Sequence, residues 1–132
     1  MTITIPVYRV EHIKHRNGPY RATNGHYSKV TEELRWDHTD ADHPSVWRDY
    51  MANGEQLRIQ RDEVCGFSSA EQILTWFAGY ITGLNRANFV LAIYNVPIQD
   101  VRQGMAQVVF TRADLEPVDR IRLTELEQSA SL

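Results

Sequence analysis

The fold is decided by residues 64–77, VCGFSSAEQILTWF, in the middle of the chain. A short apolar run ends at Gly66-Phe67, after which the Ser68 hydroxyl can cap a helix while Glu71 returns a hydrogen bond to the Ser68 N–H. Apolar side chains then recur at i, i+3 and i+4 spacing, at Ala70, Ile73, Leu74, Phe77, Ile81 and Leu84. This spacing predicts one main amphipathic helix over residues 69–84, whose apolar stripe covers a sheet.

The segments on both sides of this helix predict strands. Val7-Tyr8-Arg9-Val10 alternates between two faces, and residues 89–96 are almost continuously apolar, which is typical of a strand buried on both sides. Residues 107–110 and 118–123 add two more strands. We therefore expect a single α+β domain over residues 1–124, with a mixed or antiparallel sheet of about five strands. A flexible tail is expected at 125–132.

Composition and charge limit the classes of function. A chain of 132 residues with 42% hydrophobic residues can form one core of normal size. The formal charge of -3 gives no long-range attraction for nucleic acid or anionic membranes, so indiscriminate nucleic-acid binding is not expected. The lone Cys65 suits a reducing compartment, and no run approaches the ~20 apolar residues that span a bilayer. We expect a cytoplasmic protein with no membrane association.

Arginines near the first strand are candidate ligand-binding residues. Arg9 lies within a strand that also carries core residues, so its charge must reach solvent, an acid or a bound anion. Glu11, Asp62 or Glu63 could pair with it, which is the structural interpretation. The functional interpretation is that Arg9 and Arg21 bind a diphosphate, because the planar guanidinium matches phosphate oxygens.

Three other patterns each leave a structural alternative open. A helix that begins at Ser68 and Ser69 can bind a phosphate through free N–H groups, although capping alone explains these serines. Aromatic side chains in the polar first half can line a cleft, bind a partner or cover a small core: Tyr20, Tyr27, Trp36, Trp47 and Tyr50. A metal-dependent hydrolase would use His12, His15, His38 and His43. No ligand spacing supports that alternative, so no metal is expected.

In their order along the chain, these segments resemble the small ADP-ribosyltransferase-like domains. Such domains have a first strand with a key Arg or His, a Ser- or Thr-started helix after a second strand, an apolar strand, and a late strand that begins at a catalytic Glu. The resemblance implies that the protein binds NAD. Arg9 would contact its ribose or phosphates, Ser68 and Ser69 would support the nicotinamide ribose, and Tyr8 or Tyr20 would stack on nicotinamide.

The chain departs from this family at Gln107, which stands at the position of the catalytic Glu. A neutral amide keeps a hydrogen bond to the ribose but loses the carboxylate that stabilises positive charge in the transition state. Either another acid, such as Glu71 or Glu11, takes its place, or the domain binds without catalysing. The first hypothesis is an enzyme that transfers ADP-ribose from NAD to a host macromolecule.

The alternative is a protein that binds and inhibits a partner. A short acidic chain with aromatic, polar loops also resembles accessory proteins of bacteriophages, which act in the cytoplasm of a bacterial host. On this hypothesis Trp36, Trp47, Tyr27 and Tyr50 would be the anchors of an interface with a host protein, and no catalysis would occur.

Overall fold

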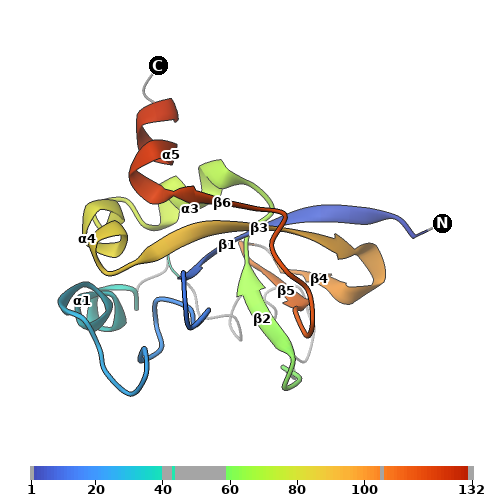
Figure 1. Ribbon diagram of the computed structural model, residues 1–132, viewed down its shortest axis with the longest axis horizontal. Coiled ribbons are helices and arrows are strands. Elements are labelled where there is room, and N and C mark those ends of the chain that lie inside the picture. The colour runs from blue at the N-terminus through green and yellow to red at the C-terminus, as the bar shows by residue number, and fades with distance from the viewer. Residues whose placement is uncertain (1, 40–42, 44–58, 105, 131–132) are drawn as a thin grey trace.

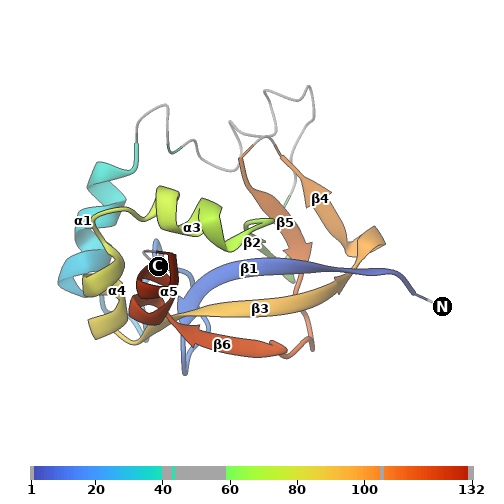
Figure 2. The same ribbon diagram turned by 90° about the horizontal axis from the view of Figure 1, so that it is seen from above.

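The computed structural model describes residues 2–39, 43, 59–104 and 106–130. Within these ranges, six strands form two three-stranded antiparallel sheets. In the first sheet, β1 (Thr4–His12) pairs with β3 (Phe89–Pro97), which pairs with β6 (Asp119–Arg122). In the second, β5 (Val108–Thr111) lies between β2 (Glu63–Gly66) and β4 (Val101–Gln103). Figure 2 shows β1, β3 and β6 side by side, with the helices gathered near one end.

The described helices are α1 (Lys29–Asp37), α3 (Ala70–Trp76), α4 (Ile81–Arg86) and α5 (Leu123–Ala130), with a short 3-10 turn at Ile98–Asp100. The expected combination of α and β structure is confirmed. The expected single sheet of about five strands on one helix is replaced by two sheets and several short helices (Figure 1). Helix α5 occupies most of the segment that the sequence predicts as a tail.

The prediction of a single helix over residues 69–84 is wrong, because a turn interrupts the helix between α3 and α4. Helix α3 ends at Trp76, with Phe77 as its C-cap, and Gly79 takes a φ of +90°, a left-handed conformation that glycine adopts without steric cost. The apolar spacing nevertheless marks the buried side of both helices, since Ile73, Ile81 and Leu84 are at most 2% exposed. An apolar stripe predicts which side is buried and does not exclude a break.

In the described part of the chain, one isolated backbone bridge joins the two sheets. Tyr8 on β1 and Phe67 after β2 exchange backbone hydrogen bonds of 2.8 and 2.7 Å. Gly66 lies at this junction, where a Cβ would stand 2.8 Å from the Tyr8 carbonyl oxygen. Glycine therefore permits the close approach that joins the sheets.

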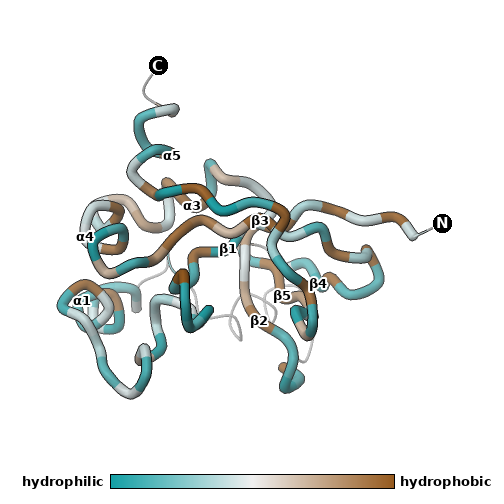
Figure 3. The backbone as a smooth tube through the Cα atoms, in the orientation of Figure 1, coloured by the Kyte–Doolittle hydropathy of each residue, from teal (hydrophilic) through white to brown (hydrophobic). Residues whose placement is uncertain are grey.

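Strand β3 is buried along most of its length, as its apolar run predicts, and Figure 3 shows hydrophobic colour along this strand. Val10 and Leu91 belong to the core on the helix side, together with residues of α1, α3, α4 and α5. Val7 and Tyr94 belong to the core between the two sheets, which also contains Phe110 of β5. Strand β1 continues on this inner face from Val7 to Arg9 and Glu11, so polar groups follow the apolar core toward one end of the sheets.

Candidate functional site

A single buried carboxylate organises the polar end of the inner face. Glu11 is 1% exposed, and both of its oxygens accept from the Tyr94 hydroxyl at 2.8 Å. Three arginines surround it: Arg9 donates to it at 3.1 Å, and Arg16 and Arg112 form ion pairs at 3.6 and 3.5 Å. Pairing satisfies the carboxylate, which would otherwise be too costly to bury.

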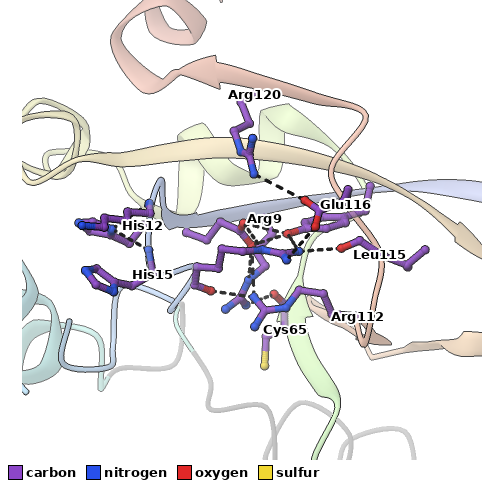
Figure 4. A network of polar contacts seen from close by, with 12 residues as sticks. Arg9, His12, His15, Cys65, Arg112, Leu115, Glu116 and Arg120 are labelled. Atoms are coloured by element: carbon purple, nitrogen blue, oxygen red, sulfur yellow. Dashed lines mark hydrogen bonds and ion pairs between the residues drawn. The ribbon is translucent and has the colours of Figure 1, made fainter. Parts of the chain in front are cut away.

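Loops and strands from distant parts of the chain hold these arginines in place. Arg9 donates from Nη1 to the Cys65 carbonyl on β2 at 2.6 Å. Arg16 donates from Nη2 to the Tyr94 hydroxyl and the Leu115 carbonyl, and its own carbonyl accepts from Arg112 Nη1 at 2.7 Å. Figure 4 shows Arg112 close to Arg9 and Cys65, with Glu116 and Leu115 on another side of the network. The result is an excess of positive charge beneath β1.

These arginines line a cavity of about 710 Å³. Its described lining also includes Arg21, Gln107 and Glu63. The Glu63 carboxylate accepts hydrogen bonds from Arg102 Nε at 2.9 Å and from Arg102 Nη2 at 2.8 Å. The volume lies within the range of roughly 300–1,000 Å³ that is typical of small-molecule sites. The fold therefore provides a cavity of ligand size with a cationic wall.

The opposite wall of the cavity is aromatic. The Trp76 indole N–H donates to the Tyr20 hydroxyl at 2.7 Å, and this hydroxyl pairs with His38 Nδ1. His43 stacks on His38 with ring centroids 3.7 Å apart, and Phe67 and Phe77 complete the wall. Burial raises the pKa of Tyr20 above its usual value, so the phenol is neutral at physiological pH. The cavity thus combines fixed cations on one wall with aromatic rings on the other.

Four of the residues proposed for NAD binding or catalysis line this cavity, namely Arg9, Tyr20, Arg21 and Gln107. Tyr8 instead packs against the core on the helix side. Arg9 pairs with Glu11, as one interpretation of the sequence predicts, and also reaches the cavity wall. Four residues named from the sequence, in three segments of the chain, thus line the same cavity.

Ser68, Ser69 and Glu71 are not among the described residues that line the cavity. The predicted capping box of Ser68 and Glu71 is wrong by one residue, because Ser69 is the N-cap and Gln72 completes the box. Gln72 Oε1 also accepts from the Ser68 N–H at 3.0 Å, which explains the preference for the later position. Glu71 is exposed in the first turn of α3.

Arg16, Arg112 and Trp76 line the cavity, and the sequence did not predict any of them as binding residues. Arg16 and Arg112 lie in loops 96 residues apart, and no local spacing relates them. The position of Glu11 did carry a signal, since residues two apart on a strand share a face. This spacing predicts that Glu11 and Arg9 lie side by side, and the two side chains form an ion pair.

Two of the proposed partner-binding residues lie on or beside α1. Trp36 is 73% exposed and Tyr27 is 41% exposed, and the Arg35 guanidinium lies 4.2 Å from the centre of the Tyr27 ring. Trp47 and Tyr50 lie outside the described residues. We refer to the two exposed rings, Trp36 and Tyr27, together as the aromatic patch.

The described residues contain no group of three metal-ligating side chains close enough to hold an ion. His12 and His15 are neighbours at 5.1 Å between ring centroids, whereas His38 and His43 belong to the cavity wall. In the same part of the chain, no helix has the length and apolar character needed to cross a membrane.

Comparison with known proteins identifies one family. Residues 1–124 match the family model described as Bacteriophage T4 Y00F protein. No curated protein and no solved structure matches the chain.

Proposed function

The chain belongs to the family of the bacteriophage T4 Y00F protein, and we propose that it is a phage accessory protein that binds NAD in the arginine-lined cavity. The observation that supports this proposal is that Arg9, Tyr20, Arg21 and Gln107 line one cavity, although they come from three separate segments of the chain. The resemblance to ADP-ribosyltransferase-like domains assigns Arg9 and Tyr20 to NAD and places Gln107 at the catalytic position. Arg21 is a candidate for the diphosphate because of its guanidinium group.

The chemistry of the two walls suits the two parts of a dinucleotide. Guanidinium groups can bind the diphosphate, and the rings of Tyr20, Phe67 and Trp76 offer apolar faces to a base or to nicotinamide. A rigid wall favours binding, because less conformational freedom is lost when the ligand enters. The hydrogen bonds from Trp76 to Tyr20 and from Arg9 to Cys65 provide that rigidity.

We propose binding without transfer of ADP-ribose. Gln107 is 7% exposed and carries an amide where the related domains have a carboxylate. The nearby carboxylates are engaged elsewhere, since Glu11 is surrounded by three arginines and Glu63 is bound by Arg102. Glu71, the predicted substitute, lies outside the described lining of the cavity. A developing positive charge at the anomeric carbon would therefore lack a free carboxylate from these residues.

The test is calorimetric titration of the full chain with NAD, followed by an assay for released nicotinamide. We expect binding that weakens in Arg21→Gln and is unchanged in Arg35→Gln, a matched variant on the surface of α1. We also expect no nicotinamide release by the natural protein and measurable release by Gln107→Glu. The absence of NAD binding would overturn the proposal, and turnover by the natural protein would overturn its non-catalytic part.

The aromatic patch supports a second candidate function, the binding of a bacterial host protein. A tryptophan that is 73% exposed is unusual, because large aromatic side chains gain most from burial. Such side chains are frequent anchors of protein interfaces. Trp36 donates to the Glu32 carboxylate at 3.2 Å, which orients the ring on the surface of α1.

The second candidate is tested by comparing the proteins retained from host lysate by the natural chain, by Trp36→Ala and by Ile98→Ala. Ile98 is 52% exposed and lies in the 3-10 turn after β3, so it controls for general loss of exposed apolar surface. We expect one host protein to be lost with Trp36→Ala alone. Equal retention by all three would exclude the aromatic patch as the interface.

A further inference from the structure

We propose that the cationic corner of the cavity, defined as Arg9, Arg16 and Arg112 around Glu11, binds a doubly charged phosphate group through Arg9 and Arg112. The inference rests on the proposed function, because it names the part of a nucleotide that the cavity recognises. It adds a residue, Arg112, that neither the sequence nor the family resemblance assigns to binding.

The charges of the corner do not balance. Three guanidinium groups face one buried carboxylate, and the further acid near Arg16 is Glu116, which is 75% exposed and 3.7 Å away. Burial lowers the pKa of Arg9, and the charge of Arg112 lowers it further, while Glu11 opposes both effects. Like charges held this close and partly away from water are costly. A bound dianion would neutralise the two excess positive charges.

Donor atoms remain available at the corner. Arg9 uses Nε for Glu11 and Nη1 for the Cys65 carbonyl, and in the described part of the chain its Nη2 makes no hydrogen bond. Arg112 Nη1 donates to Glu11 and to the Arg16 carbonyl. Within the described residues, Nε and Nη2 of Arg112 make no hydrogen bond. Both side chains line the cavity. Two guanidinium edges can thus present N–H groups to the oxygens of one phosphate.

The backbone at Gly18 packs closely against one of these donors. Gly18 lines the cavity, and a Cβ at this position would stand 3.2 Å from Arg9 Nη2. A side chain here would crowd the donor that remains available. Glycine therefore lets the backbone approach this guanidinium closely at the wall of the cavity.

Arg16 acts as a positioning residue. Its Nη2 atom is committed to Tyr94 and Leu115 at 2.9 and 2.7 Å, and its carbonyl holds Arg112. Tyr94 in turn donates a hydrogen bond to Glu11, and Glu11 also accepts one from Arg9. These bonds fix the two binding arginines before any ligand arrives, which lowers the entropic cost of binding.

The experiment is calorimetric titration of the full chain with inorganic pyrophosphate, and separately with NAD. We compare the natural protein with Arg112→Gln and with Arg35→Gln, whose arginine lies on α1 with 41% of its side chain exposed. Loss of charge-assisted hydrogen bonds to phosphate predicts that Arg112→Gln weakens pyrophosphate binding by about tenfold or more. Arg35→Gln should bind as the natural protein does.

A second variant keeps the test decisive if Arg112→Gln does not fold. Arg112→Lys retains the charge but replaces the planar fork with a single ammonium, so we expect it to bind pyrophosphate more weakly than the natural protein and to melt cooperatively. Circular dichroism melting of each variant identifies any that are unfolded.

The outcomes separate the two proposals. Pyrophosphate binding without NAD binding would remove NAD as the ligand and retain the anion site. NAD binding that is insensitive to both Arg112 variants would retain the proposed function and overturn the cationic corner. The absence of pyrophosphate binding to the natural protein would also overturn it.

Discussion

The Tyr94 hydroxyl lies 2.8 Å from both carboxylate oxygens of Glu11, on the shared inner face of the paired strands β1 and β3. Burial raises the pKa of Tyr94, and although the Arg16 hydrogen bond lowers it, the negative charge of Glu11 raises it further. The phenol therefore remains a neutral donor at physiological pH. A neutral donor and three cations together make an ionised Glu11 acceptable in the interior.

Replacing Glu11 by Gln should destabilise the protein by about 3–5 kcal/mol, because it leaves the surrounding arginines without their common anion. Urea denaturation at pH 7 measures this change. Tyr94→Phe removes one hydrogen bond and keeps the charges, so it should cost less, about 1–3 kcal/mol. Equal stabilities for the natural protein and Glu11→Gln would show that the network does not stabilise the fold.

Gly66→Ala should destabilise the junction of the two sheets by roughly 1–3 kcal/mol, as expected for overpacking. The added Cβ would meet the Tyr8 carbonyl oxygen at 2.8 Å and Val7 Cγ1 at 2.9 Å, and the carbonyl belongs to a backbone held by two hydrogen bonds. Thermal melting of the variant gives the change in stability.

Gly83→Ala in α4 is the matched control. Its Cβ would approach Val30 Cγ2 at 2.9 Å, an atom of a side chain rather than of the backbone, and alanine favours a helix over glycine by about 1 kcal/mol. Gly83→Ala should therefore cost less than Gly66→Ala. The reverse order would contradict the claim that backbone approach at Gly66 joins the sheets.

Local periodicity predicted the elements of this fold better than it predicted their connections. The apolar run in β3 and the alternation in β1 depend on neighbours in sequence, and both strands form where the pattern places them. The division into two sheets depends on the contact between Tyr8 and Phe67, which are 59 positions apart and carry no mutual signal. The apolar stripe continues across the turn between α3 and α4, where Gly79 takes a left-handed conformation, so the stripe alone did not reveal the interruption.

The candidate site shows the same limit. An arginine within a strand must find an acid or a ligand, so Arg9 could be identified from its position alone. Arg112 follows β5 and Arg16 follows β1, and their meeting at Glu11 is a property of the assembled sheets. Aromatic character likewise could not separate Tyr20, which lines the cavity, from Trp36, which is exposed.

Trp36→Ala should leave the free energy of unfolding within about 0.5 kcal/mol of the natural value, as is usual for an exposed position. Leu34 on the same helix is fully buried, so Leu34→Ala should cost about 2–5 kcal/mol. Chemical denaturation of both variants tests the orientation of α1. A large loss of stability in Trp36→Ala would show that this ring belongs to a core and is not an interface anchor.

Stability should fall in mildly acidic solution because of His12. Burial, followed by the charges of His15 and Lys14, lowers the pKa of His12 below its usual 6.5. Its Nδ1 atom accepts from the backbone N–H groups of Lys14 and His15 at 3.1 and 3.2 Å, which requires the unprotonated nitrogen. The unfolded chain therefore binds a proton at a higher pH than the folded chain does.

From this linkage, the contribution of His12 is complete above its unfolded pKa and is lost as the pH falls through that value toward the folded pKa. His12→Asn can keep an acceptor near the Nδ1 position and cannot titrate, so its stability should decline less between pH 7 and pH 5 than that of the natural protein. Urea denaturation across this range measures both slopes, and His26→Asn controls for an exposed histidine. Identical slopes for the natural protein and His12→Asn would mean that protonation of His12 does not oppose folding.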